Sequence, residues 1–379
     1  LIMGNQGAEI SRELGYRGMV AFQGKSDQRP ALYVSTWSRS RGPGPLILRS
    51  ENGTDFVTVS KPGLIDLPIN SLRLLVPFKD RLFTAPTGSG QGNPNTSGVP
   101  VDYESSDPAK GEWQAVNEPG FGDLNNRTIF ELRDFGDYLY AGTVNNNGCQ
   151  IWRTLAEGKP PYDWTNVISN GAGRGSLNQM ITSMMVFKEA LYVGTGIQNG
   201  GYDHLNKIGP AGAEIIRIER DGSWQIMVGE IRNSKRPLSG LAAGFNNIFS
   251  GYIWKMGIHE GWLYAGTMDW STVLRFTTFE NRPDNFIRLF GQVGLENVVQ
   301  QQGGFELWRS YDGENWLPVT RQGFGNPYNY GVRNIVSTPY GVFIGTANPF
   351  GPRVAKQTED GKWIYVDNPN GGLEVWLGQ

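Results

Sequence analysis

The chain contains only two histidines, His204 and His259, so candidates for acid–base chemistry are few. His204 follows Asp203 in a polar segment, and a carboxylate beside an imidazole can orient it or tune its pKa for proton transfer. Tyr252 stands where a loop enters an apolar segment, and its phenol could reach a ligand. We therefore predict Asp203, His204 and Tyr252 as catalytic candidates. The alternatives are a solvated loop histidine and a packed tyrosine.

Arginine is the second residue type that could do chemistry here. When the repeats described below are aligned, one position of the predicted innermost strand holds these residues in chain order: Arg17, Arg73, Phe130, Thr182, Trp254 and Arg333. In a closed ring of repeats the three arginines would be neighbours, and converging guanidiniums suit a carboxylate, phosphate or sulfate. We expect the arginines to hold the anionic group of a ligand, with Trp254 and Phe130 against its apolar part. The alternative is ion pairing of each arginine with an acidic residue such as Glu9, Asp66 or Asp123.

Composition argues against several other kinds of site. Two distant histidines and one cysteine, Cys149, cannot assemble a zinc cluster, and we find no phosphate-binding loop or dinucleotide fingerprint. No metal or cofactor is therefore expected, although oxygen-rich loops leave calcium open. Cys149 is predicted to be a small buried strand residue.

The overall charge and hydropathy pattern narrow the expected partners. A net charge of −2 argues against a general nucleic-acid or membrane-surface role, and no run of 18 apolar residues occurs. We expect a soluble protein whose partner is a small-molecule ligand or substrate. A secreted or periplasmic location with a removed leader, and an additional domain upstream, both stay open.

The elements that must position these residues come from a short sequence that recurs six times. It is centred on an aromatic residue and reads Leu32–Thr36, Leu82–Ala85, Leu139–Thr143, Leu191–Thr195, Leu263–Thr267 and Val342–Thr346. The spacing of about 50 to 80 residues is typical of a propeller or a solenoid. We call this sequence the tag.

Each tag belongs to a predicted group of four strands. An apolar stretch and a polar turn precede it, as in Met184–Phe187 with Lys188 and Glu189, which is typical of a hairpin. A third strand follows, as in Phe305–Ser310, and then a turn and a fourth strand that ends near Val319. Four antiparallel strands per copy are the composition of a propeller blade.

The third-to-fourth turn resembles the Asp-box hairpin of the sialidase-like β-propeller superfamily. Ser310–Trp316 is the best match, and Ser50–Phe56 is a weaker one. An acidic or amide side chain in such a turn caps backbone amides, so these residues are expected to be structural.

These patterns predict an all-β fold, a single β-propeller domain over residues 1–379 with six four-stranded blades. The expected blades lie near 16–60, 70–117, 127–168, 178–229, 251–320 and 330–379. The last copy takes Gly371–Trp376 as its third strand, and an N-terminal strand within 1–14, around Glu9, completes that blade. An alternative register uses Val354–Val366 as the last two strands.

The repeats differ most in two kinds of connection, which emerge on the same side of a four-stranded blade. Long segments join second to third strands at Gly88–Pro100, Gly196–Gly212, Met268–Gly304 and Ala347–Gly371. Others join one blade to the next, as in Gly229–Gly251. Elaborate loops on a rigid scaffold are where binding and chemistry usually reside, so we expect one site at this loop-rich mouth.

A second resemblance covers most of the chain. The repeated Leu-Tyr-x-Gly-Thr tag and Glu306–Trp316 are similar to the propeller half of cyanobacterial cylindrocyclophane-forming enzymes. That family joins alkyl chlorides to resorcinol rings or carboxylates, so the resemblance implies alkyl transfer in secondary metabolism.

The sequence leaves three classes of function open. We favour a small-molecule enzyme acting at the mouth on an amphiphilic or aromatic substrate with an anionic group. The alternatives are a sialidase-like glycoside hydrolase and a non-catalytic propeller that binds glycan or protein, with Trp270 and Phe350 as contacts.

Overall fold

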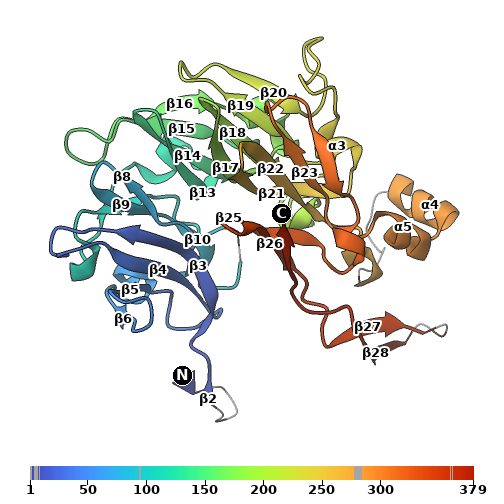
Figure 1. The fold of residues 1–379 in the computed structure, drawn as a ribbon, viewed down its shortest axis with the longest axis horizontal. Helices are drawn as coiled ribbons and strands as arrows, with labels where there is room; N and C mark the ends of the chain where they lie inside the picture. The colour runs from blue at the N-terminus through green and yellow to red at the C-terminus, as the bar shows by residue number, and fades with distance from the viewer. Residues whose placement is uncertain are drawn as a thin grey trace. The chain divides into compact units, whose positions relative to one another are not determined.

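Antiparallel β-strands form most of the regular secondary structure (Figure 1). The computed structural model describes residues 2–3, 7, 9–93, 95–276, 284–358, 360 and 362–379. The chain divides into two compact units, Leu1–Ile181 and Thr182–Gln379, and we describe each by itself. Within the described ranges, no helix has the length and apolar character needed to cross a membrane.

The first unit contains three successive blade-type groups of strands. The first has the strands β3 (Glu13–Phe22), β4 (Ala31–Ser38), β5 (Ile47–Ser50) and β6 (Val57–Thr58). In the second, the inner strands are each broken in two: β7 (Ile69–Leu72) and β10 (Pro86–Ser89) pair with each other and join the sheet of the first group through β4, whereas β8 (Val76–Phe78), β9 (Arg81–Thr84), β11 (Tyr103–Ser105) and β12 (Gln114–Ala115) form a four-stranded sheet. The third has β13 (Asn126–Phe135), β14 (Tyr138–Asn145), β15 (Ile151–Thr154) and β16 (Thr165–Ile168).

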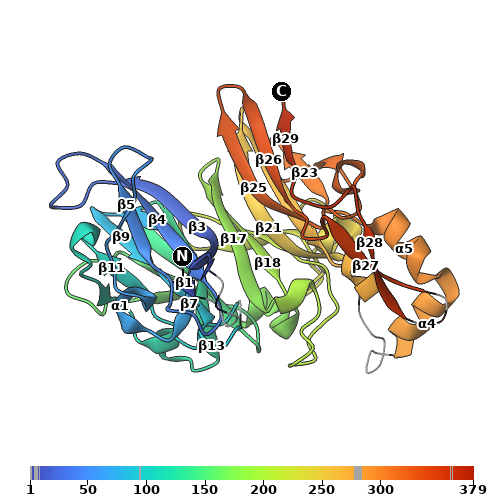
Figure 2. The ribbon, with the colours of Figure 1, turned by 90° about the horizontal axis from the view of Figure 1, so that it is seen from below.

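The remaining three sheets lie mainly in the second unit. The fourth begins with β17 (Met180–Phe187), which crosses the boundary between units, and continues with β18 (Ala190–Gly196), β19 (Ile215–Ile218) and β20 (Trp224–Val228). The fifth has β21 (Ser250–His259), β22 (Trp262–Asp269), β23 (Leu307–Ser310) and β24 (Leu317–Thr320). The sixth has β25 (Gly331–Thr338), β26 (Gly341–Ala347) and β29 (Val375–Gly378), side by side in Figure 2. The predicted all-β class and propeller blades are confirmed, with one group of strands for each tag.

The tags form the second strands, and their sequence reflects where those strands lie. β18 is buried at every residue, whereas the fourth strand β20 begins with two exposed residues. A strand covered on both faces needs apolar side chains in succession rather than in alternation. This explains why the tag reads as a continuous run and the outer strands do not.

The fourth residue of a tag sets how closely the next sheet can approach. A Cβ added to Gly194 would lie 2.6 Å from Cβ of Ile253, and one added to Gly266 would lie 2.4 Å from Cβ of Val332. These distances are too short for carbon atoms, so glycine is required there by the neighbouring strand.

A tight left-handed turn precedes several blades. Phe121, Phe245 and Phe324 have positive φ angles of 57°, 59° and 57°, each directly after a glycine. The turn is fastened by a side chain at the start of the following sheet, as when Asn329 Nδ2 donates to the carbonyl of Gly323 at 3.0 Å. The hydrogen bond stabilises a backbone conformation that phenylalanine rarely adopts.

The phenylalanine of this turn lies against a tryptophan of the third strand. Phe245 stacks on Trp308 with ring centroids 4.7 Å apart and planes within 6°. The Trp308 indole N–H in turn donates to Glu306 at 2.7 Å. The same arrangement recurs in two other blades, with Phe121, Trp152 and Gln150, and with Phe324, Trp376 and Glu374. We call each of these a Phe–Trp stack.

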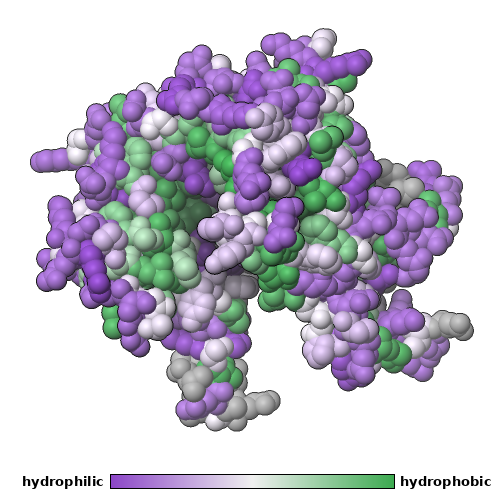
Figure 3. Space-filling model, in the orientation of Figure 1, coloured by the Kyte–Doolittle hydropathy of each residue, from purple (hydrophilic) through white to green (hydrophobic). Residues whose placement is uncertain are grey.

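Two insertions extend the second unit. Helices α4 (Asp284–Val293) and α5 (Leu295–Gln302) lie between β22 and β23, and Phe290 and Val298 pack into a cluster with Phe249 and Trp270. Hydrophilic residues cover most of the visible surface of this helical pair (Figure 3). A hairpin of β27 (Arg353–Gln357) and β28 (Trp363–Asp367) lies between β26 and β29 in sequence.

The strands near the two ends of the chain test the prediction of how the last blade is completed. β29 pairs with β26, and Ile344 faces Trp376, so the expected third strand of the last blade is confirmed and the alternative at Val354–Val366 is not. The segment around Glu9 differs from expectation. Strand β2 (Glu9–Ile10) pairs with β1 (Ile2–Met3) in a two-stranded sheet, and no pairing with the last blade occurs within the described residues. The closure by this segment and the single-domain organisation remain predictions.

Turn caps follow the sequence-based expectation, and the lone cysteine follows it in part. Asp312 accepts hydrogen bonds from the backbone N–H groups of Glu314 and Asn315 at 2.9 and 2.7 Å, as a turn-capping carboxylate should. Cys149 is fully buried as expected, but it lies two residues before β15 and not in a strand.

Candidate functional site

Asp203 stabilises the loop in which it lies through hydrogen bonds. One carboxylate oxygen accepts from the N–H groups of Leu205 and Asn206 at 3.0 and 3.2 Å, and the other accepts from Asn206 Nδ2 at 2.7 Å. His204 is exposed, and its ring meets Tyr202 edge-on at 4.7 Å. Asp203 therefore acts as a turn cap, and the catalytic roles of Asp203 and His204 remain predictions.

Tyr252 is buried and tied to the same loop. Its hydroxyl accepts a hydrogen bond from the backbone N–H of Gly200 at 3.2 Å, and a Cβ on Gly251 would lie 1.9 Å from the Gly200 carbonyl oxygen. The loop after β18 thus packs directly onto the start of β21. Tyr252 also meets Trp254 edge-on at 5.9 Å. The structure therefore brings Tyr252 together with Trp254, one of the predicted ligand contacts.

The guanidinium of Arg333 lies over the indole of Trp254. The distance from Cζ to the ring centroid is 4.6 Å, within the range of a cation–π interaction. Burial lowers the pKa of Arg333, partly offset by Tyr330, and burial raises the pKa of Tyr330. Within the described part of the chain, Arg333 forms no ion pair with a carboxylate. Its charge is therefore desolvated without an acidic partner.

Aromatic rings extend from this arginine along the starts of β21 and β25. Trp254 meets Tyr330 at 5.7 Å, and Tyr330 meets Phe350 edge-on at 6.0 Å. A Cβ on Gly331 would lie 2.2 Å from Trp254, so the indole fills the space that a larger residue would take. We call Tyr252, Trp254, Tyr330 and Phe350 the aromatic row.

The other two predicted arginines, in the first unit, also stack on aromatic rings. Arg17 lies 4.3 Å from the centroid of Trp37, and Arg73 lies 4.1 Å from that of Phe130. Phe130 is only 2% exposed, so its face is covered by Arg73 rather than presented to a ligand. The convergence of all three arginines spans both units and remains a prediction.

Two of the acidic residues offered as alternative partners are engaged elsewhere. Asp66 pairs with Lys61 at 3.1 Å, and Asp123 accepts from Gln150 Nε2 at 2.7 Å. Hydrogen bonds of this kind, which outweigh the effect of burial, lower the pKa of Asp123. Thr182, the remaining member of the aligned position, donates its hydroxyl to the carbonyl of Ile253 at 2.7 Å.

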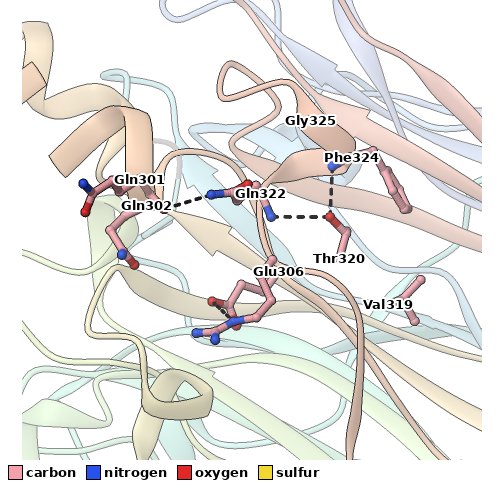
Figure 4. Close-up of a pocket in the computed structure, with 9 residues that line it drawn as sticks. Gln301, Gln302, Glu306, Val319, Thr320, Gln322, Phe324 and Gly325 are labelled. Atoms are coloured by element: carbon pink, nitrogen blue, oxygen red, sulfur yellow. Dashed lines mark hydrogen bonds and ion pairs between the residues drawn. The ribbon is translucent and has the colours of Figure 1, made fainter. Parts of the chain in front are cut away.

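A polar pocket of about 430 Å³ is bordered by Phe324, the phenylalanine of the Phe–Trp stack of the sixth blade (Figure 4). Its lining includes Gln301 and Gln302 from α5, Thr320 at the end of β24, and Gln322. Glu306 also borders the pocket, where it accepts from Arg321 Nε at 3.3 Å. Burial raises the pKa of Glu306, which Asn247, Trp308 and Arg321 partly oppose. Its role in the stack explains these contacts without a ligand.

Asp269 is a buried carboxyl that the sequence did not point to. In the third blade the corresponding strand pair carries Asn126 and Asn145, joined by a hydrogen bond of 2.9 Å. In the fifth blade Ser250 faces Asp269, and the shorter side chain leaves Asp269 Oδ2 buried without a partner in the described residues. Burial, aided by Glu306 and opposed by Ser271 and Thr272, raises the pKa of Asp269 to about 8. The signal was an acidic residue at a position where another repeat has an amide.

Comparison with known proteins gives structural similarity only. No protein-family model matches the chain, and no curated protein matches its sequence. Virginiamycin B lyase from Staphylococcus aureus is similar over 94% of this chain and 85% of its own, with 10% identity and a TM-score of 0.47. The six-bladed lectin of Aleuria aurantia is similar over 96% and 99%, with 9% identity and a TM-score of 0.42. A putative 6-phosphogluconolactonase from Bacteroides uniformis covers 97% and 100%, with 10% identity and a TM-score of 0.41.

Proposed function

We propose that this protein binds a small molecule with an aromatic or amphiphilic body and an anionic group, at the aromatic row and Arg333. Catalysis on that molecule is the favoured extension, with an enzyme of secondary metabolism as the leading class. The single observation that carries the proposal is the desolvated guanidinium of Arg333 over Trp254, which has no carboxylate partner in the described chain.

The energies involved favour a missing anion over a purely structural arginine. A cation–π contact contributes about 0.5–2 kcal/mol. Withdrawing an ion from water costs several kcal/mol when burial is complete, and Arg333, which is partly exposed, bears only part of that cost. Stacking on Trp254 therefore offsets only part of the cost of desolvation, and a bound carboxylate, phosphate or sulfate would offset more.

The rings beside Arg333 favour a ligand that is not a bare ion. Tyr330 and Phe350 lie next to Trp254, and aromatic faces and edges contribute to binding of flat or aliphatic groups. A ligand that joins an apolar body to an anion would use both the rings and the guanidinium.

Benzoate and its neutral analogue benzamide test this assignment. We expect benzoate to quench tryptophan fluorescence and to bind more tightly than benzamide, because only benzoate compensates the charge. Arg333→Met keeps the length of the side chain, and should weaken benzoate binding by about tenfold or more, to the level of benzamide. Arg353→Met removes an exposed arginine of the same unit, 3.5 Å from Asp367, and should change neither affinity.

Two results would contradict the proposal. Equal binding of benzoate and benzamide to the unaltered protein would show that no charge is recognised. Unchanged benzoate binding in Arg333→Met, measured by isothermal titration calorimetry, would place the anion elsewhere.

The specific chemistries suggested by resemblance need separate assays. An alkylating enzyme would release chloride from an alkyl chloride in the presence of resorcinol. A sialidase-like hydrolase would release a fluorescent phenol from an aryl sialoside. Loss of either activity in Arg333→Met would connect it to the proposed site. Benzoate binding without either activity would favour a non-catalytic binder or a different reaction.

A further inference from the structure

The fifth blade lacks a side chain that connects three segments of the sixth blade. In the sixth blade, Asn329 Nδ2 donates to the carbonyl of Gly323 at 3.0 Å and to Glu374 Oε2 at 2.7 Å. Asn329 Oδ1 accepts from Asn348 Nδ2 at 3.2 Å. This amide therefore joins the turn before the blade to the end of the second strand and the start of the third. We call it the bridge.

The third blade has the same bridge. Asn126 Nδ2 donates to the carbonyl of Gly120 at 2.9 Å and to Gln150 Oε1 at 2.8 Å. Asn126 Oδ1 accepts from Asn145 Nδ2 at 2.9 Å. Two blades of different sequence thus satisfy the same three groups with one amide, so the bridge belongs to the blade architecture and not to one sequence.

Ser250 takes the position of the bridge in the fifth blade. It is the direct partner of Asp269 across β21 and β22, as Asn126 and Asn145 are paired in the third blade through neighbouring positions of β13 and β14. A Cβ added to Gly244 of the preceding turn would lie 3.2 Å from Cβ of Ser250, so Ser250 lies against that turn. Serine has one hydroxyl in place of the amide, and the three hydrogen bonds of the bridge cannot all form.

Asp269 directs one oxygen at the missing bridge. Its Oδ1 accepts from the N–H of Thr272 at 3.2 Å, as Asn145 Oδ1 accepts from the N–H of Asn147 at 2.9 Å. Asp269 Oδ2 therefore takes the place of Asn145 Nδ2, the atom that bonds to the bridge. Asp269 is 0% exposed, and its Oδ2 has no hydrogen-bond partner in the described chain.

Glu306 also lacks the bridge. Its Oε2 accepts from Trp308 Nε1 at 2.7 Å, as Glu374 Oε2 accepts from Trp376 Nε1 at 2.8 Å, so the two carboxylates are oriented alike. Glu374 Oε2 receives a second hydrogen bond from Asn329, and Glu306 Oε2 has no such amide donor among the described residues. Glu306 is 1% exposed.

Short contacts hold these groups around Ser250. Its hydroxyl lies 3.4 Å from Thr267 Oγ1, which accepts from the N–H of Glu306 at 2.9 Å. The carbonyl of Gly244, in the turn against Ser250, loses the bridge in the same way. Asp269, Glu306 and the turn therefore border one position, that of the missing bridge.

The chemistry of this position favours a cation that prefers oxygen ligands. Two carboxylates, a backbone carbonyl and a hydroxyl meet there, and these are groups that bind Ca²⁺ in proteins. Arg321 Nε, 3.3 Å from Glu306 Oε1, offsets one of the two negative charges. A water molecule could donate to two of the oxygens, but it would leave the second charge buried and uncompensated, which is costly.

We infer that the fifth blade binds Ca²⁺ at the position of the missing bridge. Asp269 Oδ2, Glu306 Oε2, the carbonyl of Gly244 and the hydroxyl of Ser250 are the protein ligands, and water completes the coordination sphere. The pKa of Asp269 given above is that of the protein without the ion. No ligand belongs to the Arg333 site, so either proposal can fail while the other stands.

Thermal unfolding of the protein after treatment with EDTA and removal of the chelator tests the inference. Addition of CaCl₂ to about 1 mM should raise the melting temperature by about 2–4 °C or more, because an ion that binds the native state stabilises it. MgCl₂ at the same ionic strength should raise it less, because Mg²⁺ requires a smaller, octahedral site.

A matched pair of variants separates this site from the rest of the blade framework. Glu306→Gln removes one carboxylate ligand and should abolish the calcium-induced shift. Glu374→Gln makes the same change at the corresponding residue of the sixth blade and should keep the shift. Gln150 stands at this position in the third blade, so glutamine is compatible with the architecture. Arg333→Met should also keep the shift.

A double variant rebuilds the bridge. Ser250→Asn combined with Asp269→Asn gives the fifth blade the pair that the sixth blade has in Asn329 and Asn348. We expect it to unfold at a higher temperature than the EDTA-treated unaltered protein and to show no shift with CaCl₂.

The absence of a calcium-induced shift in the unaltered protein would overturn the inference, and would mean that water or a proton on Asp269 satisfies the position. Equal shifts with CaCl₂ and MgCl₂ would also contradict it. A shift of full size in Glu306→Gln or in the double variant would place the ion elsewhere. If Glu306→Gln does not fold, the double variant still decides the result.

Discussion

Asp102 lies directly before β11, at a position where the neighbouring repeat has an aliphatic strand residue. In the second blade Ser105 faces Leu82, and in the third Thr154 faces Leu139, so Asp102 corresponds to Ile151. Asp102 is fully buried, and neither carboxyl oxygen has a hydrogen-bond partner in the described chain. Burial raises its pKa well above the usual value. The native protein therefore keeps a proton on Asp102 that the unfolded chain releases.

This proton makes stability fall as pH rises. The effect of Asp102 is smallest below the pKa of the unfolded chain, about 4, and grows as the pH increases toward the native pKa. Asp102→Asn should match the unaltered protein at pH 4 and be more stable at pH 7.5, by about 1–3 kcal/mol in the free energy of unfolding. Urea denaturation at both pH values measures the difference. The same change at exposed Asp134 is the control, and an equal effect in both variants would contradict the interpretation.

At the level of residues, the sequence predicted which positions correspond between repeats better than it predicted which side chains contact each other. The arginine alignment followed from the tag, and the structure pairs Arg333 with Trp254 and Arg73 with Phe130 from that same aligned position. The stacking of Arg17 on Trp37 was not predicted, because Trp37 lies beyond the end of a tag. The capping hydrogen bonds of Asp203 were not predicted, because they depend on the conformation of its own turn.

At the level of elements, the glycine of the tag separates two kinds of blade contact. Gly266 has the side chain of Val332 within 2.4 Å of its missing Cβ, whereas the nearest atom to that of Gly345 is 3.4 Å away, on Asn334. The first position is closed to any side chain, and the second has room for a methyl group.

Alanine substitution should therefore have opposite results at the two glycines. We expect Gly266→Ala to lower the free energy of unfolding by about 1–3 kcal/mol through overpacking. Gly345→Ala should be neutral or slightly stabilising, because alanine loses less backbone entropy than glycine on folding. Thermal and urea denaturation of the two variants provide the measurement. Equal destabilisation would show that strand conformation, and not contact with Val332, requires the glycine.

At this level the sequence predicted the strands but not the Phe–Trp stacks that hold neighbouring segments together. The tag and its hairpin are local patterns, and local patterns predict strands well. The Phe–Trp stack joins a turn such as Gly244-Phe245 to Trp308, more than 60 residues later. The signal was present as a repeated Glx-x-Trp sequence, but the turn needs a positive φ at phenylalanine, which composition does not suggest.

At the level of the whole molecule, two sets of carboxyl groups act on stability in opposite directions. Burial raises the pKa of Asp102, Asp269 and Glu306, and each of these favours folding most at low pH. In Asp312 and Glu374, hydrogen bonds outweigh the effect of burial and lower the pKa, so each loses its contribution as pH falls through the native value.

The balance predicts a stability maximum on the acidic side of neutrality. The free energy of unfolding should decrease below about pH 4 as turn-capping carboxylates are protonated. It should also decrease from about pH 4 to about pH 8, because native Asp269, with a pKa of about 8, keeps a proton that the unfolded chain has released, and it should level off above pH 8. Asp269→Asn, which restores the amide found at Asn145, should reduce the decrease between about pH 4 and 8 and leave the decrease below about pH 4. Denaturation curves from pH 3 to 9 test this, and a steady rise through pH 8 would refute it.

The number and order of the blades could be predicted because the same local sequence pattern recurs in each of them. Closure of the array could not be settled in the same way, since it depends on short terminal strands with little sequence signal. The segment around Glu9 illustrates this, because a two-residue strand can pair with whatever lies nearby.

Cys149, the sole thiol of the chain, is buried two residues before β15, the third strand of its blade. A maleimide dye can reach that sulfur only when the surrounding structure unfolds locally. The labelling rate would therefore measure how often the segment around Cys149 opens. Each molecule could then carry a single fluorophore at a known residue, without any substitution in the chain.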